Sequence, residues 1–145
     1  NWMLCCLYDY RGQPDSAVVC FQNALECTDP PYKMLRDIVR FADREHARQL
    51  HKLLNDNTLP DTLKFTLYAF QAFNKGDFRD AVRYFDQIGM ANLSPLALYD
   101  YGSALFKMNE TEKAEAAFLM MKKLAQDKKD SHDLAQAFVG LACIA

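Results

Sequence analysis

The apolar positions in residues 61–90 predict two helices folded back on each other. Over residues 61–74, apolar side chains fall on nearly every face of a 3.6-residue period, which indicates a helix with neighbours on several sides. Residues 78–88 follow with apolar positions on one side only. Between them, Gly76 suits a left-handed C-cap and Asp77 suits the N-cap of the second helix. A link this short predicts an antiparallel hairpin.

The same spacing of residues recurs elsewhere in the chain. An alanine lies five residues after Gly76 and a phenylalanine nine residues after it, and the same two residue types follow Gly12 at the same distances. The pattern also fits Asn109, because asparagine tolerates left-handed backbone nearly as glycine does. Gly76 and Asn109 are 33 residues apart, whereas Gly12 and Gly76 are 64 apart, which is twice 32. A fixed period of this size is typical of stacked helical hairpins. The three sets are Ala17, Phe21 and Ala24; Ala81, Phe85 and Ile88; and Ala114, Phe118 and Met121.

Small residues and caps repeat in the same phase. A small residue seven positions before each turn would let paired helices approach to about 8–10 Å. These residues are Cys5, Ala69 and Gly102. A capping side chain also precedes a proline twice, at Asp29 before Pro30 and at Ser94 before Pro95, which predicts helix starts there.

The period, the small residues, the turns and the alanine–phenylalanine spacing together resemble tetratricopeptide repeats (TPRs). The best-matched set is Gly12, Ala17, Phe21, Ala24 and Pro30. The resemblance implies an all-α fold in which antiparallel helix pairs stack into a right-handed superhelix. We therefore predict one TPR-like repeat domain over residues 1–145, with units at about 1–30, 31–60, 61–93 and 94–126 and the start of a further unit at 133–145.

Two segments depart from the repeat. Residues 31–60 lack the glycine and phenylalanine landmarks, and residues 31–57 fit either a hairpin that turns near Asp43 or one long helix. We favour the hairpin, because the 64-residue offset keeps the stacking phase only if one full unit lies between. Residues 126–133 are polar and predict a lengthened loop, after which residues 134–145 begin a new first helix with Gly140 at the small-residue position. Because no second helix follows it, we expect the chain to be a piece of a longer solenoid.

Composition narrows the range of functions. The net charge of −2 argues against a partner drawn by charge, such as nucleic acid or anionic lipid. No apolar run is long enough to span a membrane, so membrane insertion is not expected. The five cysteines, Cys5, Cys6, Cys20, Cys27 and Cys143, show no disulfide framework and mostly occupy apolar helix positions. They predict buried free thiols in an intracellular, reducing compartment, cytoplasmic or nuclear.

Motifs for catalysis and for cofactors are absent from the sequence. It contains no glycine-rich phosphate loop, no zinc-protease motif, no paired CxxC and no nucleophile elbow. The three histidines, His46, His51 and His132, are not spaced to hold a metal from one helix face. The sequence therefore predicts a protein that is not an enzyme and binds no cofactor or metal.

The TPR resemblance implies partner binding along the concave face formed by the first helices. The residues at these positions are Trp2, Cys6 and Asp9; Thr66, Phe70, Phe73 and Asn74; and Tyr99, Ser103, Phe106 and Lys107. Only Asn74 and Lys107 resemble the basic and amide lining that grips acidic chaperone tails, so that subfunction is not expected. We interpret the set as an apolar groove for a partner helix or extended segment, anchored by its aromatic residues. The competing interpretation is that some of these rings pack between successive first helices.

A row of basic residues recurs every four positions before the central hairpin. Its members are Arg36, Arg40, Arg44, Arg48 and Lys52. The row could bind an acidic partner or a nucleic-acid backbone, or it could be a solvated helix face with ion pairs of its own. We favour the solvated face, because acidic residues interrupt the row.

The leading hypothesis is a non-enzymatic protein–protein interaction scaffold within a multisubunit complex. The alternatives are a chaperone or adaptor that holds one peptide, and the regulatory repeat region of a larger enzyme. Self-association through exposed solenoid ends is also expected, using Trp2, Met3 and Leu7 at one end and Phe138, Val139 and Leu141 at the other.

Overall fold

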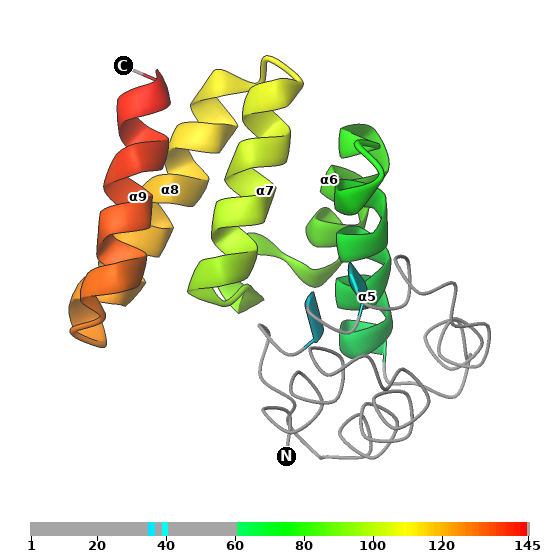
Figure 1. Cartoon of the computed structure of the whole chain (residues 1–145), viewed down its shortest axis with the longest axis horizontal. Coiled ribbons are helices and arrows are strands. Elements are labelled where there is room, and N and C mark those ends of the chain that lie inside the picture. Colours follow the sequence, from blue (N-terminus) through cyan, green and yellow to red (C-terminus); the bar gives the residue numbers. More distant parts are fainter. Residues whose placement is uncertain (1–34, 37–38, 41–60, 145) are drawn as a thin grey trace, which may run out of the picture. The chain divides into compact units, whose positions relative to one another are not determined.

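The computed structural model describes residues 61–144 together with residues 35–36 and 39–40. All regular structure in this part of the chain is helical, which confirms the all-α class (Figure 1). The chain divides into two units, residues 1–67 and 68–145, which are described separately. In the first unit, Leu35, Val39 and Leu67 are buried. The predicted repeat units before residue 61 lie outside the described residues, apart from the four residues named above.

The helices follow one another with short connections. They are α5 (Asp61–Asn74), α6 (Phe78–Ile88), the 3₁₀ turn η1 (Met90–Asn92), α7 (Pro95–Lys107), α8 (Thr111–Asp127) and α9 (Ser131–Ile144). The predicted bounds of α5 and α6 are confirmed to the residue. At the start of α7, the hydroxyl of Ser94 accepts a hydrogen bond from the backbone N–H of Ala97 at 3.4 Å, as predicted from the proline that follows it.

The turn between α5 and α6 has the predicted chemistry. Gly76 is left-handed at φ +78°, and the N–H of Asp77 reaches back to the carbonyl of Ala72 at 2.9 Å. The carboxylate of Asp77 then accepts from the N–H of Asp80 at 3.2 Å and caps α6. Beyond the turn, the rings of Phe73 and Phe78 meet edge to face with centroids 5.6 Å apart. These contacts close the hairpin.

The same turn occurs twice more. Asn109 is left-handed at φ 62°, as predicted, and the N–H of the next residue, Glu110, bonds to the carbonyl of Leu105 at 2.9 Å. Lys129 is left-handed at φ 54°, and here the N–H of Asp130 bonds to the carbonyl of Ala125 at 2.9 Å. All three turns therefore end a helix with the same hydrogen bond, from the residue after the left-handed one to the carbonyl five residues earlier.

The third turn corrects the prediction of a long polar loop at residues 126–133. Helix α8 continues to Asp127, α9 already begins at Ser131, and only three residues connect them. The carboxylate of Asp130 accepts hydrogen bonds from the N–H groups of His132 and Asp133, each at 3.1 Å, and so starts α9. The polar residues are thus the exposed last turn of one helix and the capped first turn of the next.

Phe118 of α8 packs between α7 and α9 in the core of the second unit. Its ring is 3% exposed and lies against Gly102 of α7 and Gly140 of α9. A Cβ atom at Gly102 would fall 2.8 Å from the ring, and one at Gly140 would fall 2.5 Å from it. Any other residue type at either position would bring a Cβ atom too close to the ring, so the ring fits only because both residues are glycine. Ala114, Ala117 and Met121 of α8 are fully buried around it.

Helices α6 and α7 meet through an aromatic pair and a buried hydroxyl. The ring centroids of Phe85 and Tyr101 are 5.7 Å apart, and the hydroxyl of Tyr101 donates a hydrogen bond to the carboxylate of Asp86. Burial, and then the hydrogen bond and negative charge of Asp86, raise the pKa of the Tyr101 hydroxyl well above its ordinary value. The folded protein therefore holds this proton more tightly than the unfolded chain does.

A pH series should reveal this linkage. The unfolded tyrosine ionises near pH ~10. Because the folded state keeps the proton at higher pH, the stability that Tyr101 contributes is complete below pH ~10 and is lost as the pH rises above it. Tyr101→Phe should lower the free energy of unfolding by about 0.5–1.5 kcal/mol at pH 7, and its alkaline decline should be shallower. Urea denaturation from neutral to alkaline pH measures both. Identical alkaline slopes for the two proteins would contradict the assignment.

Candidate functional site

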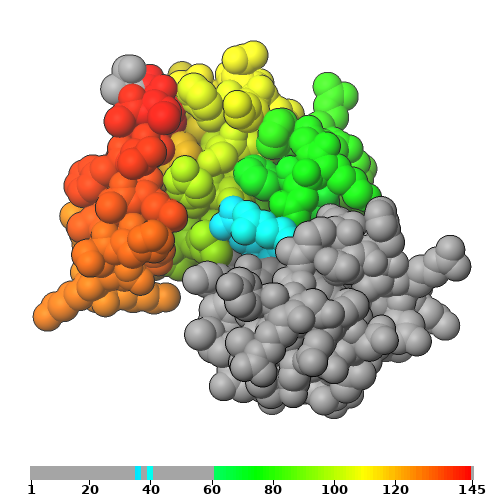
Figure 2. All heavy atoms as spheres, in the orientation of Figure 1, coloured from blue at the N-terminus to red at the C-terminus, as the bar shows by residue number. Residues whose placement is uncertain are grey.

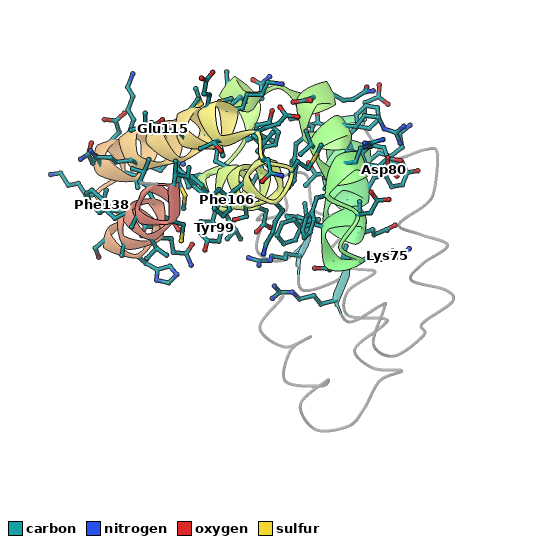
Figure 3. The ribbon with its side chains drawn as sticks, turned by 90° about the horizontal axis from the view of Figure 1, so that it is seen from above. Lys75, Asp80, Tyr99, Phe106, Glu115 and Phe138 are labelled. Carbon is teal, nitrogen blue, oxygen red and sulfur yellow. The ribbon has the colours of Figure 1, made fainter. Side chains whose placement is uncertain are left out.

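Four of the predicted groove residues lie along one side of α7. Tyr99, Ser103, Phe106 and Lys107 are spaced at intervals that place them on one helix face. Phe106 is 38% exposed, Lys107 is exposed, and the other two are partly exposed. Figure 3 labels Tyr99 and Phe106 on this helix. These side chains therefore reach the surface of α7, and their role in a groove stays a prediction.

The rest of α7 faces the core, which explains why this strip remains open. The residues buried there are Pro95, Ala97, Leu98, Asp100, Tyr101, Gly102, Ala104 and Leu105. Helix α7 contacts α6, α8 and α9, so three neighbours occupy its other sides. The strip is therefore what remains of a helix that is otherwise enclosed.

Tyr99 has a fixed position at one end of this strip. Its ring packs on that of Phe118, with centroids 5.9 Å apart and planes tilted by 58°. One side of the Tyr99 ring is consequently part of the core, while the remainder stays accessible. A ring held in this way loses little further freedom when a partner binds, which favours binding. At the other end, Phe106 and Lys107 provide an exposed ring beside the single positive charge of the strip.

The structure corrects the role of Phe70. The sequence placed Phe70 in the groove, but its side chain is only 1% exposed and its ring meets Phe85 of α6 edge to face, with centroids 6.4 Å apart. Phe73 also packs on a ring of α6, that of Phe78, so both rings lie at the hairpin interface. Helix α5 is apolar all round, so periodicity could not choose the face that packs on α6.

The remaining groove residues differ in exposure. Phe73 is partly exposed beside Phe78, and Asn74 is exposed at the end of α5. Thr66 is buried, and its hydroxyl donates to the carbonyl of Thr62 at 2.7 Å, so it is not a groove residue. Trp2, Cys6 and Asp9 lie outside the described residues. The groove interpretation therefore applies to the strip on α7 and to the exposed end of α5.

The basic row is described at two positions only. Arg36 is partly exposed and Arg40 is exposed, and both are helical. Arg44, Arg48 and Lys52 lie outside the described residues, so the row stays a prediction.

The described part of the chain shows few features of chemistry beyond the α7 strip. No group of three or more His, Cys, Asp or Glu side chains there is arranged to hold a metal ion. None of the helices in residues 61–144 combines the length and the apolar character needed to cross a lipid bilayer. Cys143 is a free thiol, as predicted, but it is exposed rather than buried, because it lies on the outer side of α9. The other four cysteines lie outside the described residues.

The sequence analysis missed one exposed apolar residue. Leu119 of α8 is 47% exposed, although the periodicity argument considered only the buried positions of this helix. Phe138 and Val139 of α9, which the sequence placed at an exposed end, are 50% and 55% exposed.

Comparison with known protein families, with characterised proteins and with solved structures found no match for this chain.

Proposed function

We propose that this chain is a non-enzymatic interaction module, built of stacked helical hairpins, that binds a partner protein through the open strip of α7. The partner presents a helix or an extended segment with apolar side chains for Tyr99 and Phe106. An acidic or carbonyl group of the partner would accept a hydrogen bond from the ammonium group of Lys107. A module of this kind would serve as a scaffold within a multisubunit complex.

The packing around Phe118 supports stacking. One ring of a second helix lies against a glycine in the first helix of its own hairpin, Gly102, and against a glycine in the next first helix, Gly140. A repeat in which each second helix contacts two successive first helices produces this arrangement. The three turns that share one hydrogen-bond pattern support the same conclusion. These observations favour the TPR-like solenoid that we propose as the finer architecture.

The observation that carries the binding function is the exposure of Phe106. A phenylalanine ring contributes stability when it is buried, yet this one is 38% exposed on a helix whose opposite face is fully packed. Aromatic residues, phenylalanine among them, are enriched at protein–protein interfaces. The strip also holds only one charge, so a partner would lose little hydration of charged groups on binding.

A peptide-binding experiment tests this proposal. Peptides selected from a displayed library against the whole chain should bind with an affinity that Phe106→Ala weakens by about 2 kcal/mol or more. Val139→Ala is the matched control, because it shortens an exposed apolar side chain on a different helix. Titration calorimetry of the three proteins with the same peptide gives the comparison. The proposal fails if no peptide binds, or if both variants bind as the unaltered chain does.

A further inference from the structure

The exposed side of α8 has Leu119 at its centre and opposite charges on either side. Leu119 is 47% exposed. Glu115 lies four residues before it and Lys123 four residues after it, so the three side chains share one side of the helix, and both charged residues are exposed. The exposed side of the helix thus changes from acidic to basic through an apolar centre.

Helix α9 extends this apolar centre. Phe138 is 50% exposed, and its ring lies beside α8, with the ammonium group of Lys122 5.3 Å from the ring centroid. Figure 3 labels Glu115 on α8 and Phe138 on α9. In the space-filling view, α9 is open along its length on the face shown (Figure 2). We call the set Glu115, Leu119, Lys122, Lys123 and Phe138 the α8–α9 surface.

The acid and the base that flank Leu119, Glu115 and Lys123, cannot pair with each other within one helix. Glu115 and Lys123 are eight residues apart, which corresponds to about 12 Å along the axis. Neither side chain forms an ion pair within the part of the chain that the structure describes. Other surface acids and bases do pair locally, as Lys113 does with Glu110 at 2.8 Å. Glu115 and Lys123 are therefore both available to charges on another molecule.

We propose that the α8–α9 surface is the interface of a homodimer, in which α8 packs antiparallel to α8 of a second copy about a two-fold axis at Leu119. This axis places Glu115 of each copy opposite Lys123 of the other, so two ion pairs form from one arrangement. Leu119 then packs on its own equivalent at the centre, and Phe138 adds apolar area beside it. The surface supplies its own complementary charges, which favours a second copy over an unrelated helix. This inference is independent of the open strip of α7.

Charge exchange tests this register. Analytical ultracentrifugation of the full chain over a concentration series should show a dimer that weakens as salt is added. Glu115→Lys and Lys123→Glu should each weaken it by about tenfold or more, because two attractive pairs become repulsive. The double variant Glu115→Lys, Lys123→Glu should dimerise as the unaltered chain does. An equimolar mixture of the two single variants should also dimerise, because two positive charges of one variant then face two negative charges of the other.

Lys75→Glu is the control, because it makes the same change in charge at an exposed position in the turn after α5. It should leave the dimer unchanged, and circular dichroism should show that every variant remains helical. A chain that stays monomeric up to about 1 mM would overturn the proposal and would leave the surface to a different protein. A dimer that forms equally well with either single variant would also overturn it, because a different surface would then be responsible.

Discussion

Phe118→Ala is expected to lower the free energy of unfolding by about 3–5 kcal/mol. The ring is 3% exposed and lies against both glycine positions and the ring of Tyr99, so its removal leaves a cavity among three helices. The backbones of α7 and α9 are held by their other contacts and can close this cavity only in part, which is why the loss exceeds the transfer free energy of the ring. Urea denaturation followed by circular dichroism measures the change.

Phe106→Ala is the matched comparison. It removes the same ring from a position that is 38% exposed, and it should cost less than half as much as Phe118→Ala. The comparison separates rings that build the core from rings that the fold leaves for a partner. Equal losses of stability for the two variants would show that Phe106 belongs to the core, and the binding role of the α7 strip would be lost with it.

Gly140→Ala is expected to destabilise the protein, although alanine favours helices. The added methyl group would fall 2.5 Å from the ring of Phe118, which is too close for any ordinary contact. The ring is enclosed and has little room to move, so overpacking should cost about 1–3 kcal/mol. This cost should exceed the gain of about 1 kcal/mol that alanine brings over glycine inside a helix.

The sign of this effect should reverse when the ring is absent. In the Phe118→Ala background, Gly140→Ala no longer meets the ring, so it should stabilise the protein by up to about 1 kcal/mol. A double-mutant cycle of the four proteins isolates the contact from the helix propensity. A destabilisation of the same size in both backgrounds would mean that α9 does not pack on Phe118 through this glycine. The stacking of hairpins in the proposed architecture would then lose its main support.

Much of the local structure in residues 61–144 was predictable from the sequence. Gly76, Asn109 and Ser94 determine backbone conformation through their own side chains, or through the lack of one, and each is found as predicted. Phe85 and Phe118 occupy the same position of the repeated pattern, and both are buried. These features depend on interactions within a few residues or on the helical period, which is why sequence alone suffices for them.

The turn at Lys129 was not predictable, because a lysine has no intrinsic preference for left-handed backbone. The packing of Gly140 on Phe118 holds α9 close to α8, and the carboxylate of Asp130 starts α9 at once, so the chain between the two helices turns within three residues. Tertiary contacts thus limit this connection to three residues, although its polar residues by themselves favour a longer loop.

The face of α5 was likewise decided by tertiary structure. A helix that is apolar all round gives no information in its sequence about which ring faces which neighbour, so Phe70 was placed in the groove although it packs on Phe85. On α7, small and large apolar residues mark the buried side of the helix and leave Phe106 and Lys107 exposed. The sequence by itself determined the bounds of α5 and α6, the caps at Asp77 and Ser94, and two of the three turns. Only the packing of helices on one another decided which aromatic rings are buried, because burial depends on neighbours that are distant in the chain.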